Sequence, residues 1–354
     1  MLFKNRKLDI PIIQGGMGVG ISLGGLAGSV AACGGMGVIS AANPGYRAKD
    51  FDQNPWAVNL RELGAEIRKA KKRSEGKGLI GVNIMVAVNH YAELVQTCIK
   101  EKADAIISGA GLPLDLPKLA KGSDILLAPI VSSGKAARII CKNWDKKSQV
   151  VPDFVVIEGS EAGGHLGFEK EELVQGKAKS LMEILKEVLE ELVPYEKKYE
   201  TKIPVFVAGG VFDGYDLADY MKEGAAGAQI ATRFIATEEC DASEEYKQVF
   251  LDAGKEDLSI IKSPVGLPGR AINTPLIQKL SKGETIPPKK CMSCLQTCNP
   301  ASTPYCISRA LIEAAKGNYE EGLFFSGSNV GKLKEIKTVR AVMEEIMKQW
   351  RERQ

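Results

Sequence analysis

One short stretch of the chain gathers residue types that could do chemistry. It runs over residues 158–165, reads Glu-Gly-Ser-Glu-Ala-Gly-Gly-His, and directly follows an apolar run. It holds one of only two histidines among 354 residues. A histidine trades a proton near neutral pH, and a carboxylate from Glu158 or Glu161 would favour its charged form. We therefore expect this stretch to form half of an active site, with His165 as acid or base, although a lone histidine is more often structural.

Three glycine pairs form a second set of candidates. Gly15-Gly16, Gly163-Gly164 and Gly209-Gly210 each follow an apolar run, where glycine lets the backbone approach a ligand closely. Gly209-Gly210 and the later Ala231-Thr232 would present backbone N–H groups near helix starts, which suits a phosphate group. A single glycine pair more often makes a tight turn, but the set in these positions favours phosphate binding.

Three amides and the second histidine leave their roles open. Asn83 lies inside an apolar run, so its amide must either face a heteroaromatic ring or bond the backbone. Gln14 and Gln229 carry the same ambiguity. His90 opens a helix-like segment, and we assign it no catalytic role.

Four of the eight cysteines cluster near the C-terminal end. Cys291, Cys294, Cys298 and Cys306 follow a C-x₂-C-x₃-C-x₇-C spacing. Such a set can ligate zinc or an iron–sulfur cluster, although the spacing matches neither the usual zinc ribbon nor the ferredoxin run. Thiols that are merely packed together are the alternative. An oxygen-sensitive cluster would favour a reductase over an oxygen-using enzyme.

The elements that must position these residues are eight apolar runs that alternate with helix-like segments. Most runs are continuously apolar, as expected for parallel strands covered on both faces. Eight such units predict an α/β (β/α)₈ TIM barrel, with an open doubly wound sheet as the alternative. In a barrel the carboxyl ends of all strands share one mouth, where active sites lie. The predicted strands cover residues 10–14, 37–41, 79–86, 105–108, 125–131, 154–157, 203–208 and 228–231.

The eighth strand is not followed directly by its closing helix. We expect the barrel to comprise residues 1–237 and 323–354, with a mostly helical lid, residues 238–322, inserted over the mouth. The closing helix is predicted over residues 330–350.

Composition bounds the remaining possibilities. The net charge of +3 is too small to indicate nucleic acid or a membrane surface as a partner. No apolar run approaches the roughly 18 residues of a membrane span, and the first residues lack a signal-peptide pattern. We expect a cytoplasmic protein with reduced cysteines that acts on a small molecule. A homo-oligomer remains open.

Taken together, these motifs resemble the nitronate monooxygenase family, formerly called 2-nitropropane dioxygenase. Flavin-dependent enoyl-acyl-carrier-protein reductases are its close relatives. The resemblance covers nearly the whole chain and is carried by residues 11–17, 81–83, 158–165, 208–210, 231–234 and 325–329.

The resemblance implies an FMN-binding barrel in which His165 is catalytic. Phosphate contacts would come from the strand ends at 209–210 and 231–232, ribityl contacts from Glu158, and ring contacts from the other positions. The implied FMN-binding residues are Gly15, Gly16, Met17, Asn83, Glu158, Gly163, Gly164, Ala208, Gly209, Gly210, Ala231 and Thr232. The chain departs from the family at Ala231, where a glycine is usual, and at Ser328, where a glutamine is common.

The implied activity is the oxidation of alkyl nitronates with O₂. The alternative is an enoyl-acyl-carrier-protein reductase that draws hydride from NAD(P)H. A second alternative, from the residues alone, is a non-redox phosphate-binding barrel such as an isomerase or aldolase.

Overall fold

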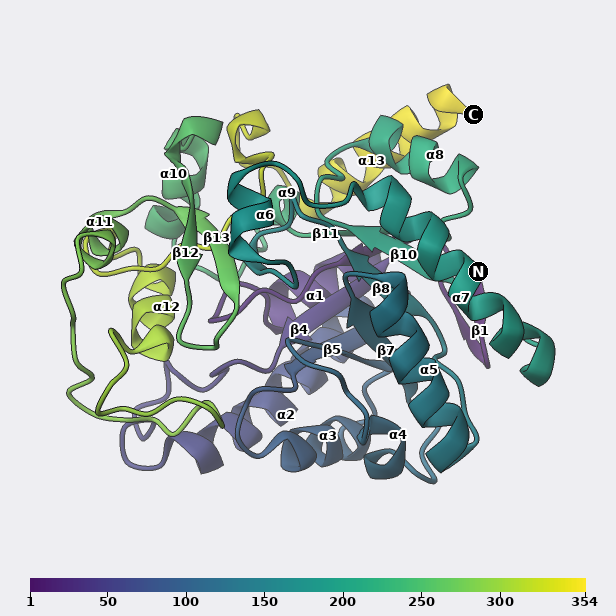
Figure 1. Ribbon diagram of the computed structural model, residues 1–354, viewed down its shortest axis with the longest axis horizontal. Coiled ribbons are helices and arrows are strands. Elements are labelled where there is room, and N and C mark those ends of the chain that lie inside the picture. The colour runs from purple at the N-terminus through teal and green to yellow at the C-terminus, as the bar shows by residue number, and fades with distance from the viewer.

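Eight parallel strands close into a barrel in this computed structural model, which describes residues 1–354 (Figure 1). The predicted TIM barrel is therefore confirmed. Each predicted strand is present to within a few residues, because the buried apolar runs and their glycine ends mark strands locally. In order around the barrel the strands are β3 (Ile12–Gln14), β4 (Met36–Ser40), β5 (Leu79–Met85), β6 (Ala105–Gly109), β7 (Leu126–Val131), β8 (Val155–Glu158), β10 (Val205–Ala208) and β11 (Gly227–Ile230).

Helices surround the barrel, and most bury one apolar face, whereas the first of them, Gly24–Ala32, is buried along nearly its whole length. Side chains that begin them cap several of their first turns: Ser180, for example, forms a capping box with Glu183. The surrounding helices are α1 (Gly24–Ala32), α2 (Pro55–Ser74), α3 (Tyr91–Lys100), α4 (Leu116–Leu119), α5 (Gly134–Ser148), α7 (Leu181–Tyr199), α8 (Gly214–Lys222) and α13 (Val339–Arg353), with short α6 (Lys170–Val174) and α9 (Thr232–Ile235) near the mouth.

The closing helix starts later than expected. We predicted it from residue 330, but α13 begins at Val339, where the Thr338 side chain accepts the N–H of Ala341. Residues Val330–Lys332 form only a 3₁₀ turn. A cap residue can thus set a helix start that a lysine- and glutamate-rich pattern leaves ambiguous.

An N-terminal hairpin closes the end of the barrel opposite the mouth. Its strands are β1 (Leu2–Phe3) and β2 (Arg6–Lys7), which pair antiparallel. The ring of Phe3 packs 5.3 Å from that of Phe154 and 6.2 Å from that of Phe206. Because the hairpin covers this end of the barrel, the open end is the mouth, where the carboxyl ends of the strands lie.

The inserted segment contains strands as well as the expected helices. Its elements are α10 (Glu244–Asp252), a 3₁₀ turn (Lys255–Asp257), β12 (Leu258–Lys262), β13 (Pro268–Ile272), α11 (Pro275–Ser281) and α12 (Ile307–Ala315), which gather at one side of the molecule, to the left in Figure 1. β12 and β13 form a hairpin, and β13 also pairs with β9 (Gly164–His165). A stretch of the candidate site is therefore a strand of the inserted sheet. The domain boundaries at residues 238 and 322 stay a prediction.

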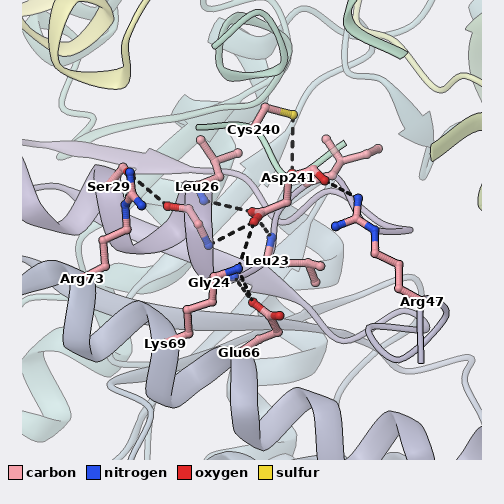
Figure 2. Close-up of polar contacts among 12 residues, drawn as sticks. Leu23, Gly24, Leu26, Ser29, Arg47, Glu66, Lys69, Arg73, Cys240 and Asp241 are labelled. Carbon is pink, nitrogen blue, oxygen red and sulfur yellow. Dashed lines mark hydrogen bonds and ion pairs between the residues drawn. The ribbon is translucent and has the colours of Figure 1, made fainter. Parts of the chain in front are cut away.

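A buried carboxylate ties the insertion to the barrel (Figure 2). Helix α1 has no side-chain cap of its own. Asp241 instead accepts the N–H groups of Leu23 at 2.9 Å, Gly25 at 3.1 Å and Leu26 at 2.9 Å. Glu66, from α2, accepts the N–H of Gly24 at 2.7 Å. Negative charge at a helix N-terminus is favourable, so these contacts fix α1 against both α2 and the insertion.

None of the helices combines the length and the apolar character needed to span a membrane.

Candidate active site

A cavity of about 240 Å³ opens at the mouth of the barrel. Its walls come from the carboxyl ends of β3, β5, β8, β10 and β11, from β9, and from residues 325–329. Every predicted FMN-binding residue lines it, as does His165: Gly15, Gly16, Met17, Asn83, Glu158, Gly163, Gly164, Ala208, Gly209, Gly210, Ala231 and Thr232. The structure thus brings the whole predicted set to one place, and the role of each member stays a prediction.

Two glycines after β10 form a cradle of free backbone donors. Gly209 and Gly210 have φ angles of +85° and +101°, a conformation that favours glycine. A Cβ on Gly209 would lie 2.8 Å from the backbone nitrogen of Ala162. The N–H groups of Gly209, Gly210 and Ala231 donate to no acceptor in the protein. Neighbouring backbone N–H groups that lack a protein acceptor can cradle an anion, so this corner suits a phosphate.

The segment of residues 325–329 forms hydrogen bonds with residues of this cradle. Asn329 donates from Nδ2 to the carbonyl of Gly210 at 2.7 Å, and the N–H of Gly327 donates to Oγ1 of Thr232 at 3.3 Å. Ser328 lines the cavity and donates its N–H to the carbonyl of Glu161 at 3.0 Å. The loop is therefore held beside Gly210 by hydrogen bonds that do not involve the side chain of residue 328.

Of the two roles that the sequence left open for Asn83, the structure shows the hydrogen bond to the backbone, and contact with a ring stays a prediction. Its Nδ2 donates to the carbonyl of Ile107 at 3.2 Å, and the residue also lines the cavity. A Cβ on Gly16 would lie only 2.4 Å from the Cβ of Asn83, so the glycine allows close contact between two strand ends. Asn83 is thereby held rigidly at the cavity wall.

Glu158 presents an unpartnered carboxyl to the cavity. It makes no hydrogen bond or ion pair with the protein, and burial alone raises the pKa of this carboxyl to about 8. An acceptor without a protein partner is a natural contact for ligand hydroxyl groups. This geometry fits the ribityl contact that the family resemblance implies.

His165 is held by the inserted hairpin. It pairs with Gly269 of β13, its Nε2 lies 2.8 Å from Oγ of Ser263, and its ring meets that of Phe325 edge-on at 5.0 Å. The N–H of Val265 donates to the same Ser263 oxygen at 3.2 Å. The direction of the bond between His165 and Ser263 depends on the ring tautomer: in the tautomer that receives the Ser263 hydroxyl at Nε2, the ring proton is on Nδ1.

The expected imidazolium form of His165 is wrong. Burial lowers the pKa of His165 to about 4, and neither Glu158 nor Glu161 bonds to the ring. Desolvation disfavours the charged form, and no carboxylate comes close enough to offset it. His165 is therefore neutral at physiological pH.

Of the remaining polar candidates, one is structural, one lines the main cavity and one lies outside it. Gln14 is structural, because its amide exchanges hydrogen bonds with the backbone of Val38 at 3.1 and 3.3 Å. Gln229 lines the cavity. His90 lies outside it, bonds Glu93 at 3.0 Å and stacks on Trp56.

Sequence reasoning missed two residues that the insertion contributes. The first, Ser263, contacts His165 directly. Arg270 donates from one guanidinium nitrogen to the carbonyls of Ser160 at 2.6 Å and Ala162 at 2.7 Å. These residues are far from 158–165 in the chain, and no local sequence motif identifies them.

A smaller chamber of about 90 Å³ adjoins the main cavity. The two share mostly apolar walls, which include Met85, Val88, Leu94 and Leu311, and both touch His165. A ligand at His165 thus has an apolar space beside it.

Of the clustered cysteines, Cys294 lines this chamber, whereas Cys291, Cys298 and Cys306 do not. All eight cysteines of the chain are free thiols. No three His, Cys, Asp or Glu side chains stand close enough together to hold a single metal ion.

Comparison with known proteins agrees with this geometry. The sequence model described as nitronate monooxygenase matches residues 1–349. A relative from Mycobacterium tuberculosis, (3aS,4S,5R,7aS)-5-hydroxy-7a-methyl-1-oxo-octahydro-1H-indene-4-carboxyl-CoA dehydrogenase, is 25% identical over 96% of this chain and 92% of its own. A probable nitronate monooxygenase from Staphylococcus saprophyticus is 27% identical over 78% and 79%. The structure of FabK from Thermotoga maritima superposes with a TM-score of 0.73 at 26% identity, over 98% of this chain and 94% of that one.

Proposed function

The chain belongs to the nitronate monooxygenase family of FMN-dependent oxidoreductases, and from this premise we propose that it reduces the double bond of an enoyl thioester. The observation that carries the proposal is the charge of the cavity. No lysine or arginine lines it, and His165 is neutral. A nitronate anion would enter without a partner charge, which is costly, whereas an uncharged thioester would not.

Two relatives that align over almost the whole chain point the same way. One is named as a carboxyl-CoA dehydrogenase and so acts on a thioester. The other, FabK, is an enoyl-acyl-carrier-protein reductase. The family membership also sets aside the non-redox barrel that the residues alone left open.

The residues at the mouth fit FMN. The free N–H groups of Gly209, Gly210 and Ala231 would hold its phosphate, and the unpartnered Glu158 would accept its ribityl hydroxyls. Gly16 and Asn83 would lie against the ring. When bound, FMN supplies hydride transfer between a nicotinamide and an electron-poor double bond.

His165 would position and polarise the thioester. The role requires the tautomer in which the Ser263 hydroxyl donates to Nε2, because Nδ1–H is then the donor available to the thioester carbonyl oxygen. A neutral imidazole with a low pKa can donate such a hydrogen bond without being a strong acid. A neutral histidine polarises a substrate carbonyl in this way in another barrel enzyme. The adjoining apolar chamber would receive the acyl chain and exclude water from it.

Nitronate oxidation with O₂ is the second candidate. The staphylococcal relatives are named as probable nitronate monooxygenases, which favours it. Both candidates use the same flavin and the same His165, so only the substrate separates them.

The deciding experiment gives both substrates to one FMN-loaded preparation. Crotonyl-CoA with NADH or NADPH under anaerobic conditions is compared with propane 2-nitronate in air. We expect thioester-dependent NAD(P)H oxidation with a kcat/KM at least about 100-fold above that of nitronate-dependent O₂ uptake, a difference of about 2.7 kcal/mol. The reverse preference would overturn the proposal in favour of nitronate oxidation.

A further inference from the structure

The segment between α11 and α12 lacks the packing that would hold it in place. Residues 282–306 contain no helix or strand, and of their two isolated bridges only Val88–Leu295 reaches another segment, because Ile286–Tyr305 lies within the segment. Within this segment only Leu295 and Tyr305 are buried. Loops longer than about 15 residues without secondary structure are uncommon in compact domains, because their ordering entropy needs an offset. Apolar burial supplies little of that offset here.

The four clustered cysteines surround one cavity inside this segment. Its volume is about 260 Å³, and Cys291, Cys294, Cys298 and Cys306 all line it. No aspartate, glutamate, histidine, lysine or arginine contributes to its wall. The only residues there with strong metal affinity are therefore the four thiols.

The four thiols are accessible from this shared cavity. Cys291 is exposed, whereas Cys294, Cys298 and Cys306 are half-buried.

The four thiols line a cavity of about 260 Å³, and no three metal-binding side chains of the chain are grouped closely enough to hold one ion. Zinc bonds to sulfur at about 2.3 Å, so four thiolates on one zinc lie roughly 3.8 Å apart. No such close group exists in the chain. A cluster of iron and sulfide holds four cysteines around a larger body and takes a purely cysteine ligand set. We propose that Cys291, Cys294, Cys298 and Cys306 bind an iron–sulfur cluster.

The backbone around the cavity suits an anionic cluster. The N–H of Ser293 points at Sγ of Cys291 at 3.3 Å. Cys306 is the N-cap of α12, so its sulfur lies at the positive end of a nine-residue helix. Hydrogen bonds to ligand sulfurs and nearby positive potential stabilise iron–sulfur clusters.

The cluster would brace the wall between the insertion and the active site. The N–H of Asn89 donates to the carbonyl of Cys294 at 3.0 Å, and Leu295 forms a bridge with Val88. Val88 lines the main cavity, and Cys294 lines the chamber beside His165. Binding at the four cysteines therefore fixes a wall of the substrate side, whichever substrate the flavin serves.

The test is metal and sulfide analysis of the FMN-loaded protein. It is purified without oxygen and reconstituted with ferrous iron and sulfide. We expect iron and acid-labile sulfide in near-equal amounts, broad visible absorption beyond that of FMN, and an electron paramagnetic signal after dithionite reduction. Zinc without sulfide, or neither iron nor sulfide after reconstitution, would overturn the proposal.

Serine variants separate a built site from adventitious iron. Cys294→Ser and Cys298→Ser should each lower bound iron and sulfide at least about 10-fold while FMN content stays unchanged. Cys291→Ser, at the exposed cysteine, repeats the test with the least risk to folding. The control is Cys33→Ser, a half-buried thiol outside the cluster, which should keep all its iron. Equal iron in all four variants would contradict a site at these cysteines.

Discussion

The two walls of the active-site cavity are built in different ways. The barrel wall consists of strand ends whose glycines and free N–H groups follow directly from each apolar run, such as Gly209 and Gly210 after β10. The inserted wall consists of a hairpin and a closing loop that reach His165 from about 100 residues further along the chain, through Ser263.

The contrast suggests that the barrel wall binds the cofactor and that the inserted wall contacts the substrate. Backbone donors on a closed barrel cannot move without breaking the sheet, so they suit a cofactor that stays bound. Side chains on a hairpin can be exchanged without disturbing the barrel, so they suit the substrate side. Changes in the barrel wall should therefore alter flavin binding, and changes in the inserted wall should alter turnover.

The largest expected effect is that of His165→Ala. Turnover should fall by about 10²–10⁴-fold, because the donor at the substrate is lost, while FMN content stays the same. Flavin absorbance per chain and kcat of the preferred substrate measure the two effects. Loss of FMN with full turnover per bound flavin would assign His165 to the cofactor side instead.

Gly209→Ala should act on the flavin alone. The added Cβ meets the Ala162 backbone at 2.8 Å at a φ of +85°, so the phosphate cradle must shift. We expect FMN affinity to fall about 100-fold, or roughly 2.7 kcal/mol, by fluorescence titration. The control is Gly176→Ala, also at a positive φ but with open space around it, which should bind FMN normally. Equal losses in both variants would mean that backbone strain, rather than the cradle, is responsible.

Glu158→Gln should change how the stability of the FMN-free protein depends on pH. Burial raises the pKa of Glu158 to about 8 from an ordinary value of 4.5. A carboxyl with a raised pKa stabilises the fold fully below its unfolded pKa, and this contribution is lost as pH rises through 8. The free energy of unfolding of the variant should therefore rise relative to that of the natural protein between pH 4.5 and 8. The difference should reach about 2 kcal/mol at the upper end, a value that is reduced to allow for solvent access to the carboxyl. Urea unfolding at a series of pH values measures the gap, and parallel curves would refute it.

Ser263→Ala should have the smallest effect and a distinctive one. Removing the donor to Nε2 should lower kcat about 5–10-fold, the value of one hydrogen bond, with FMN affinity unchanged. Because the hydroxyl stabilises the neutral ring, its loss should also move the acidic limb of the kcat profile to higher pH. Ser263→Thr should restore part of the activity, and Ser259→Ala on the same hairpin serves as control. An unshifted pH profile would show that Ser263 only packs.

Much of the barrel wall was predictable because its signals are local. Apolar runs located the strands, glycine pairs marked three of the loops that follow them, and the predicted flavin residues from Gly15 to Thr232 all line one cavity. The wrong start of the last helix shows the limit of such patterns, since the Thr338 cap outweighs composition. The strands of the insertion were missed because β13 pairs with β9, a partner distant in sequence.

By itself the sequence determined the barrel, the mouth and the residues gathered there, because strand period and glycine positions are properties of short segments. Only the tertiary structure decided that Gln14 is structural, that Ser263 and Arg270 support the site, and that four thiols share a cavity. It also decided that His165 is neutral and Glu158 hard to ionise. Burial and long-range contacts set these properties, and neither exists until the chain has folded.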